Sequence, residues 1–482
     1  MSVALSRPAL WSAADAAVAT GGEAIGDWTA TGVSIDSRTV MPGDLFVALK
    51  GPSHDGHAFV AQALAQGAAA AMIDHPIVDV PEDAPLLLVA DTFDGLVGLG
   101  VYARLRSRAA VVAVTGSVGK TSTKEMLRLG LSAQAATHAS IGNLNNRWGV
   151  PLSLARMPAG ASFGVFELGM NHAGEIEGLS RQVKPDVAII TTVEPVHIEF
   201  FPSVEAIADA KAEIFAGMSP PGAAILNRDN AHFPRLVAHA RTRGISRIWS
   251  FGEHEEADAR LIDCSLHASS SAVTADIKGE VVQYCIGAPG RHLVTNSLAV
   301  LLAVRALGAD VATAARELAR IEAIKGRGQR RVLRLGEAPL VLIDESYNAS
   351  PPALRAALAV LAEARLPDGE VPGRHVAVLG DMLELGERAR SLHLDVKADL
   401  VAAGIDQVFC CGPHMSALFE TLPPCMQGGV APDSSALAPL VAQALRGGDV
   451  VMVKGSLGTK MAPIVAAIEA LAASAADRRK EA

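Results

Sequence analysis

The seven residues Thr115–Thr121, Thr-Gly-Ser-Val-Gly-Lys-Thr, have the residue types of a phosphate-binding loop. Val111–Val114 precede them as a buried strand would, and Lys120–Leu131 follow with helix-compatible residues. Glycines let a backbone close around an anion, and the first turn of a helix offers unpaired N–H groups and the positive end of its dipole. The order strand, loop, helix therefore predicts a site for the phosphates of a nucleotide.

Two side chains at the end of this loop would complete such a site. Lys120 would supply a positive charge to the terminal phosphates, and the Thr121 hydroxyl would be a ligand for a bridging Mg²⁺. The complete motif also has a glycine separated by four residues from Gly119, and Val114 stands at that place. A glycine-containing turn with a surface lysine is the alternative interpretation.

Polar side chains near the ends of two further predicted strands indicate a metal site. Glu167 lies near the end of the apolar segment Phe163–Met170, and His197 lies just beyond Val187–Val193. Burying Glu167 is costly unless it meets a cation or a strong donor. Because ligands gather at the carboxyl ends of parallel strands, we expect Thr121, Glu167 and His197 to form a site for a hard cation.

A lysine interrupts the apolar stripe of a predicted helix that begins after Pro202. Apolar residues recur at helical spacing from Val204 to Met218, and Lys211 lies in the middle of this stripe. Burial lowers the pKa of a lysine and leaves a nucleophilic amine that can be modified or paired with an anion. The alternative is a side chain that extends past its neighbours to solvent.

Three weaker motifs lie elsewhere in the chain. Ser37 and Arg38 follow a short predicted strand and are candidates for binding a phosphate or a uracil edge, although a solvated arginine explains the pattern as well. The turn His54–His57 has possible metal ligands, but a polar turn before a helix accounts for them and we assign no metal there. The Asn-rich turn Gly142–Asn146 is unusually polar for a linker.

The chain of 482 residues is too long for one hydrophobic core, and a prior of about 150 residues per domain suggests three domains. Strands alternate with helices throughout, so we predict an α/β protein. A small N-terminal α/β domain would span 1–108, a central parallel-sheet domain with the phosphate loop 109–328, and a Rossmann-like α/β domain 329–482. A hinge is predicted at Lys325–Gly328, where two glycines flank Arg327.

Composition excludes several classes of function. Acidic residues outnumber basic ones by 51 to 42, which gives no basic surface for nucleic acid. No stretch reaches the roughly 18 apolar residues of a membrane helix, and the N-terminus lacks a signal-peptide pattern. The five cysteines have no metal spacing and suit packing positions in a reducing cytoplasm. We therefore expect a cytoplasmic protein, and nothing in the sequence demands more than a monomer.

Several of these motifs together resemble the Mur ligases of peptidoglycan synthesis, nearly from end to end. Those that carry the resemblance are Asp36-Ser37-Arg38, Pro42–Phe46, Thr115–Thr121, Gly142–Asn146 and Asp344–Pro351, in this order. The phosphate loop of the family also lacks the earlier glycine. The sequence departs from the family at Glu345, where an Asp is usual, and at Leu457, where Arg is common. The role of the loop that begins at Lys454 therefore stays open.

The resemblance implies roles for individual residues. Those implied to bind ATP are Thr115, Gly116, Ser117, Val118, Gly119, Lys120, Thr121, Asn296, Arg327 and Asp344. Those implied to hold Mg²⁺ are Thr121, Glu167, His197 and, if carbamylated to an anion, Lys211. Those implied to act in catalysis are Lys120, Glu167, His197 and Lys211. Those implied to contact the UDP-linked substrate are Ser37, Arg38, Asn143, Asn145 and Asn146.

The activity that the resemblance implies is ATP-driven amide formation through an acyl phosphate. The absence of an Asp-Asn-Pro signature favours the family member that joins D-alanyl-D-alanine to UDP-N-acetylmuramoyl-tripeptide. Two alternatives stay open: a folylpolyglutamate synthase-like ligase with another acid, and a nucleotide-binding regulatory protein without catalysis. The sequence leaves open whether the tripeptide ends in diaminopimelate or lysine, and which residues bind D-alanyl-D-alanine.

Overall fold

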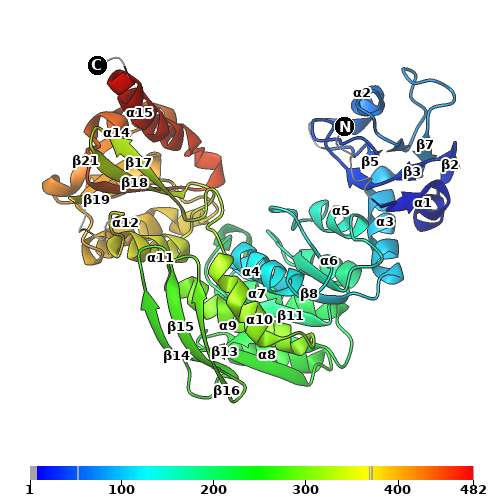
Figure 1. The fold of residues 1–482 in the computed structure, drawn as a ribbon, viewed down its shortest axis with the longest axis horizontal. Coiled ribbons are helices and arrows are strands. Elements are labelled where there is room, and N and C mark those ends of the chain that lie inside the picture. Colours follow the sequence, from blue (N-terminus) through cyan, green and yellow to red (C-terminus); the bar gives the residue numbers. More distant parts are fainter. Residues whose placement is uncertain (1–7, 52–53, 368–369, 371–372, 481–482) are drawn as a thin grey trace.

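The computed structural model describes residues 8–51, 54–367, 370 and 373–480. Its N-terminal and C-terminal parts stand apart on opposite sides of the central part (Figure 1). The sheets are separate: residues 11–88 form a two-stranded and a five-stranded sheet, 110–286 a nine-stranded sheet and 329–454 a six-stranded sheet. The α/β class with three domains is confirmed, and we keep the proposed boundaries for description.

The N-terminal domain is built on a short, mostly parallel sheet of order β2-β7-β6-β5-β4, in which only β2 is antiparallel to its neighbour. Long-range bonds fasten it to the central domain: Trp11 Nε1 donates to the Ala155 carbonyl (2.9 Å), Arg156 Nε to the Val33 carbonyl (2.7 Å) and Arg104 Nε to the Val183 carbonyl (2.8 Å). Its elements are β1 (Trp11–Ser12), α1 (Ala13–Thr20), β2 (Glu23–Ile25), β3 (Thr29–Ala30), β4 (Gly32–Ser34), β5 (Asp44–Val47), η1 (Gly56–Phe59), α2 (Val60–Ala65), β6 (Ala70–Ile73), β7 (Leu86–Leu88) and α3 (Thr92–Arg106).

The central sheet has the order β16-β15-β14-β13-β12-β11-β8-β10-β9 and is parallel from β14 to β9. Its elements are β8 (Ala110–Thr115), α4 (Lys120–Ser132), β9 (Thr137–Ala139), α5 (Gly149–Ala155), β10 (Phe163–Glu167), α6 (Glu175–Val183), β11 (Val187–Ile190), η2 (Ile198–Phe200), α7 (Val204–Ala212), η3 (Glu213–Gly217), β12 (Ala223–Asn227), α8 (Phe233–Thr242), β13 (Arg247–Gly252), β14 (Ala259–Leu266), β15 (Ser271–Ile277), β16 (Glu280–Ile286), α9 (Arg291–Ala306), α10 (Val311–Glu317) and η4 (Leu318–Arg320).

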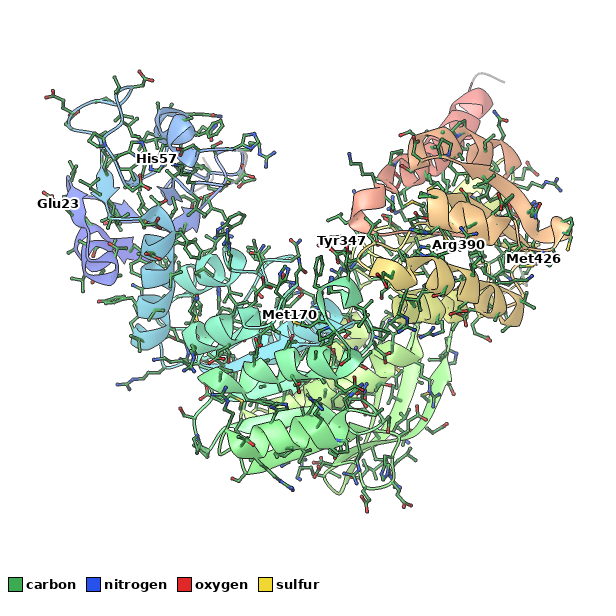
Figure 2. All side chains as sticks on the ribbon, turned by 180° about the vertical axis from the view of Figure 1, so that it is seen from behind. Glu23, His57, Met170, Tyr347, Arg390 and Met426 are labelled. Atoms are coloured by element: carbon green, nitrogen blue, oxygen red, sulfur yellow. The ribbon has the colours of Figure 1, made fainter. Side chains whose placement is uncertain are left out.

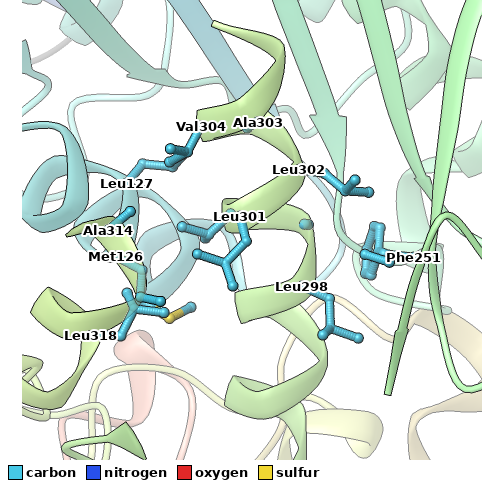
Figure 3. Close-up of a cluster of buried hydrophobic side chains, with 14 of the residues drawn as sticks. Met126, Leu127, Phe251, Leu298, Leu301, Leu302, Ala303, Val304, Ala314 and Leu318 are labelled. Atoms are coloured by element: carbon cyan, nitrogen blue, oxygen red, sulfur yellow. The ribbon is translucent and has the colours of Figure 1, made fainter. Parts of the chain in front are cut away.

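Strand β8 is buried on both faces, as a central parallel strand must be. Val112 and Val114 face a core that contains α4, α9 and α10, whereas Val111 and Ala113 face the core of α5–α8. Helix α9 is apolar nearly all round, and its leucines pack between the sheet and α4 (Figure 3). The phosphate loop thus begins at the end of a strand whose last five residues are buried, which holds it in place.

The C-terminal sheet has the order β17-β18-β22-β19-β20-β21, with only the edge strand β17 antiparallel. Its elements are β17 (Gln329–Leu335), β18 (Ala338–Glu345), α11 (Pro351–Ala362), β19 (Arg374–Gly380), η5 (Gly386–Arg388), α12 (Ala389–Ala402), β20 (Gln407–Cys411), α13 (Pro413–Phe419), η6 (Pro424–Met426), β21 (Gln427–Ala431), α14 (Ser434–Ala444), β22 (Asp449–Lys454), η7 (Leu457–Thr459) and α15 (Ala462–Lys480).

Some local expectations differ from the structure. The helix after Pro202 is α-helical only to Ala212 and then tightens into η3, so its apolar stripe spans two elements. All five cysteines are free, but Cys285 and Cys425 are exposed, so packing does not account for them. The antiparallel strands β15 and β16 extend the central sheet beyond its parallel part. Among the described residues, no helix has both the length and the apolar character needed to cross a bilayer.

Candidate active site

The phosphate loop connects β8 to α4 with two glycines in conformations that other residues rarely adopt. Gly116 has φ 149° and Gly119 has φ 84°. A Cβ at Gly119 would lie 2.4 Å from Asn296 Nδ2, and one at Gly116 would lie 1.9 Å from Thr191 Oγ1. Neither position can therefore carry a side chain. The fold thereby brings Asn296, at the start of α9, against the loop, as a shared nucleotide site requires.

The Lys120 ammonium lies inside the loop. As the first residue of α4, Lys120 donates from Nζ to the Gly116 carbonyl at 2.7 Å. Burial lowers the pKa of Lys120, the Glu167 carboxylate opposes this effect, and Arg327 adds to it. A cation is thus held at the N-terminus of a helix, where phosphate oxygens would also meet backbone N–H groups.

Several oxygen atoms at the loop are buried and have no hydrogen-bond partner among the described residues, and they include Thr115 Oγ1, Thr121 Oγ1 and Glu167 Oε2. Glu167 ends β10 in register with Val114 on β8, and its other oxygen accepts a bond of 2.7 Å from Asn145 Nδ2. An unpaired buried carboxylate oxygen is costly. Hydroxyl and carboxylate oxygens are the donors that Mg²⁺ prefers, so these residues fit that ion.

Lys211 on α7 is a buried cation of this region, with only 3% of its surface exposed. No hydrogen bond or ion pair to its ammonium group occurs among the described residues. Burial lowers the pKa of Lys211 well below its usual range, and the charge of Lys120 adds to the shift. The helical anomaly in the sequence is therefore a truly buried lysine, and the alternative of a side chain that extends to solvent is wrong.

His197 lies where the central and C-terminal domains meet. Its backbone has φ 60°, which is unusual for a residue other than glycine. Its Nδ1 contacts a carboxylate oxygen of Glu384, which follows β19 in the C-terminal domain. Burial lowers the pKa of His197; Glu384 opposes the shift, and Lys120 and Lys211 reinforce it. Glu384 is a site neighbour that sequence reasoning missed, because 187 residues separate it from His197.

The Asn-rich turn has three different environments. Asn145 orients Glu167, Asn146 Oδ1 accepts the backbone N–H groups of Trp148 and Gly149, and Asn143 is exposed. Sequence reasoning missed the lysine that anchors this turn. Lys124 on α4 is fully buried, and its Nζ donates to the Gly142 carbonyl at 2.8 Å. Its position four residues after Lys120, on the buried side of the same helix, is the signal that could have found it.

In the N-terminal domain, the candidates Ser37 and Arg38 follow β4, apart from the phosphate loop. The Arg38 guanidinium forms a two-pronged bond to Asp36, with Nε at 2.9 Å from one oxygen and an Nη at 2.7 Å from the other. This contact lowers the pKa of the Asp36 carboxyl. The Arg38 side chain is 84% exposed, whereas Ser37 is buried. Arg38 is thus presented to solvent in a fixed orientation.

The predicted hinge packs against the loop that follows β18. Gly326 and Gly328 both have positive φ, and a Cβ on Gly326 would lie 2.9 Å from Tyr347 Cβ. The Arg327 guanidinium stacks over the Tyr347 ring at 4.1 Å from its centre. Figure 2 shows Tyr347 at the side of the C-terminal domain that faces the central domain. Arg327 therefore lies at the junction of the two domains.

Asp344 and Glu345, at the end of β18, are both paired. Asp344 is 1% exposed and accepts from an Nη of Arg331 at 3.0 Å and from the Ser346 hydroxyl at 2.6 Å. Glu345 lies opposite Lys454 on β22, and their side chains form an ion pair of 3.0 Å. Glu345, where the sequence departs from the family pattern, thus pairs with Lys454, the first residue of the loop whose role the sequence left open.

The central domain has a phosphate loop with unpaired oxygen atoms of metal-ligand type, and two further α/β domains flank it. These features together define a nucleotide-dependent enzyme of three domains. Three family models match the chain: Mur ligase family, catalytic domain at 29–93, Mur ligase middle domain at 114–304, and Mur ligase, glutamate ligase domain at 330–457. The chain belongs to the Mur ligase family.

Within this family the chain is similar to enzymes named UDP-N-acetylmuramoyl-tripeptide–D-alanyl-D-alanine ligase. That of Rickettsia prowazekii is 32% identical over 95% of this chain and 99% of its own, and that of Escherichia coli is 36% identical over 81% and 83%. A crystal structure of MurF from Acinetobacter baumannii superposes with a TM-score of 0.83 at 32% identity, covering 95% of this chain and 99% of its own. The MurF ligase of Thermotoga maritima, in complex with ADP, gives 0.76 at 27%, covering 92% and 98%.

Proposed function

We propose that this protein is an ATP-dependent ligase that joins D-alanyl-D-alanine to UDP-N-acetylmuramoyl-tripeptide. The products would be the UDP-N-acetylmuramoyl-pentapeptide, ADP and phosphate, so the reaction would serve peptidoglycan precursor synthesis. The observation that carries the proposal is the phosphate loop, with Thr121 Oγ1 and one carboxylate oxygen of Glu167 left unpartnered beside it, in a chain that matches ligases of this name over nearly its full length.

The chemistry begins with a carboxylate, which is a poor acyl donor because oxide is a poor leaving group. The terminal carboxylate of the tripeptide attacks the γ-phosphorus of ATP, ADP leaves, and an acyl phosphate forms. The amine of D-alanyl-D-alanine then attacks the acyl carbon, and the tetrahedral intermediate expels phosphate and loses a proton. Lys120 binds and neutralises the transferred phosphoryl group.

The remaining residues hold and orient the reactants. Mg²⁺, held by Thr121 and Glu167, supplies charge neutralisation when bound. Asn145 fixes the Glu167 carboxylate, and His197 with a carbamylated Lys211 would complete a second cation site. The residues that we assign to the nucleotide beyond the loop are Asn296, Arg327 and Asp344. Those that we assign to the UDP-linked substrate are Ser37, Arg38, Asn143, Asn145 and Asn146.

Water competes with the amine for the acyl phosphate, so we infer that the C-terminal domain closes over the site. The segment Lys325–Gly328 is the proposed hinge. Alanine at Gly326 or Gly328 would add strain as well as stiffness, because both have positive φ. Small-angle X-ray scattering avoids this problem: the radius of gyration should fall when ATP and tripeptide substrate are added, and no change would contradict closure.

The free cysteines and the absence of a membrane-spanning helix among the described residues support a cytoplasmic enzyme, which we propose acts as a monomer. The decisive experiment is phosphate release from Mg-ATP, with the two substrates supplied separately and together. Release that requires both establishes the ligase. Release with another acid would favour a folylpolyglutamate synthase-like enzyme, and ATP binding without release would favour a regulatory protein.

A further inference from the structure

Three side chains that could ligate a metal meet in the N-terminal domain: His57, Asp74 and His75. His57 lies in η1, and Asp74 and His75 directly follow β6, at the carboxyl end of a parallel strand. One potential ligand atom from each lies within 4.8 Å of the other two. The His57 side chain is 5% exposed, that of Asp74 24% and that of His75 54%. The sequence alone gave no reason to assign a metal to the turn His54–His57. The fold places two further possible ligands beside His57, and the first of them, Asp74, is 17 residues away in sequence.

The hydrogen bonds of His57 leave one ring nitrogen facing the other two side chains. An Asp55 carboxylate oxygen accepts the His57 backbone N–H at 3.0 Å and lies 2.6 Å from Nδ1. A carboxylate can only accept, so Nδ1 carries the proton and Nε2 has the lone pair. Nε2 is 3.2 Å from an Asp74 carboxylate oxygen. Histidines that bind metals usually donate their second N–H to a carboxylate in this way.

We propose that His57 Nε2, an Asp74 carboxylate oxygen and a ring nitrogen of His75 bind one divalent transition-metal ion, with Zn²⁺ as the best fit. Tetrahedral zinc places neighbouring ligands roughly 3.3–3.5 Å apart. The separation of 3.2 Å between His57 and Asp74 already matches this spacing, whereas His75 Nδ1 is only 2.5 Å from Asp74 Oδ1. By the reasoning applied to His57, Nδ1 of His75 carries a proton toward Asp74, so zinc binding requires the exposed ring to move outward and this proton to leave Nδ1. Solvent would fill the fourth position.

The donor set decides the class of ion. Two imidazoles with one carboxylate suit zinc and its neighbours in the transition series, whereas Mg²⁺ and Ca²⁺ prefer oxygen ligands. Binding has a cost, because the Asp74 backbone N–H, 3.2 Å from His57 Nε2, would lose that acceptor. The rings of His57 and His75 lie with their centres 4.2 Å apart, so the two imidazoles are already neighbours before an ion binds.

The ion would act within the N-terminal domain by tying η1 to the end of β6. Figure 2 shows His57 in that domain, whereas Tyr347 lies at the inner edge of the C-terminal domain. Zinc should therefore stabilise the folded protein by mass action, without entering the ligase reaction. The inference does not depend on the proposed function, since its readouts are metal binding and thermal stability.

The test is a titration of the full chain with Zn²⁺ against a chromophoric zinc indicator in excess Mg²⁺, paired with thermal unfolding. His75→Ala removes an exposed ligand without disturbing the core and should weaken one site by roughly 100-fold. His54→Ala, an exposed histidine of the same turn outside the ligand set, is the matched control and should bind like the unmodified chain.

Co²⁺ provides a second readout, because a four-coordinate site absorbs strongly in the visible range and an oxygen-only octahedral site does not. The expected result is a four-coordinate spectrum that His75→Ala abolishes, together with a zinc-dependent rise in the melting temperature that the same variant loses. Equal zinc affinity in His75→Ala and the unmodified chain, or equal weakening by His54→Ala, would overturn the proposal. The three side chains would then be a hydrogen-bonded cluster only.

Discussion

The central and C-terminal sheets both gather polar side chains at the carboxyl ends of parallel strands, but these side chains differ in their partners. In the central domain Thr121 Oγ1, Glu167 Oε2 and the Lys211 ammonium are buried without partners among the described residues. In the C-terminal domain Asp344 accepts from Arg331 and Ser346, and Glu345 pairs with Lys454. Unpaired metal-type oxygens that gather beside a phosphate loop favour a binding site there, whereas the paired carboxylates of the C-terminal domain stabilise its fold.

The largest expected effect is that of Lys120→Met, which removes the cation of the phosphate loop and keeps the length of the side chain. Phosphate release in the presence of both substrates should fall by roughly 1,000-fold or more, because the variant loses the ammonium that lies inside the loop and would neutralise the transferred group. The melting temperature should change little, since burial disfavours the charged form of this lysine. A variant that keeps its activity but unfolds more easily would show that Lys120 stabilises the fold and does not act in the site.

Glu167→Gln should separate function from stability. It removes the charge that the proposed Mg²⁺ needs, so activity should drop about 100-fold or more and should require a higher Mg²⁺ concentration. The free energy of unfolding should stay within about 1 kcal/mol of the original value, because the carboxylate leaves one oxygen unpaired. Titration of activity with Mg²⁺ and urea unfolding check the two parts. A large loss of stability would contradict the assignment of Glu167 as a site residue.

Lys211 allows a test through pH and carbon dioxide. Its lowered pKa leaves more neutral amine, which CO₂ can carbamylate, so bicarbonate should raise the activity of the original chain. Lys211→Arg cannot form the carbamate and should be about 10-fold or more slower and insensitive to bicarbonate. Lys211→Met should also remove a part of the increase in the free energy of unfolding with pH. Between the lowered pKa and the usual lysine range the unfolded state binds the extra proton, so the original chain gains stability as pH rises.

Asp381 provides the contrast from the C-terminal frame. It is 3% exposed and accepts the backbone N–H of Met415 at 2.7 Å and that of His414 at 3.2 Å, in the first turn of α13. Asp381→Asn weakens one acceptor and removes a charge that favours the helix N-terminus, so unfolding should become easier by about 1–3 kcal/mol. Urea unfolding measures this change. The Michaelis constant for ATP should be unaltered, and a raised one would place Asp381 in the site.

The smallest effect concerns His138 on β9, whose ring donates to the Ser153 carbonyl at 2.7 Å. Burial lowers the pKa of His138 from 6.5 to about 4. Between these values the unfolded state binds a proton that the folded state does not, so stability falls as pH drops through this window, by at most about 3 kcal/mol. His138→Gln should flatten that part of the profile without changing activity near pH 7. An unchanged profile would show that His138 titrates normally.

Much of the site could be predicted because its signals are local. The glycines and lysine of the loop, the carboxylate at the end of an apolar strand and the lysine in an apolar stripe each stand out within about 15 residues. The contacts between Glu384 and His197, Lys454 and Glu345, and Asp74 and His57 could not be found in the same way. Each joins segments that are far apart in sequence, and their proximity depends on strand order and domain packing.

By itself the sequence determined the α/β class, the position of the phosphate loop and the place of Lys211 in an apolar stripe, because periodicity and glycine placement act over one or two turns of chain. The structure then showed that Lys211 is buried. Only the tertiary structure decided which polar groups are paired. Thr121 follows a buried strand and Glu345 ends one, and nothing local shows that the Thr121 hydroxyl lacks a partner while Lys454, from a strand distant in sequence, pairs with Glu345. The physical reason is that a hydrogen bond needs atoms within about 3 Å, and the register of strands distant in sequence sets that distance.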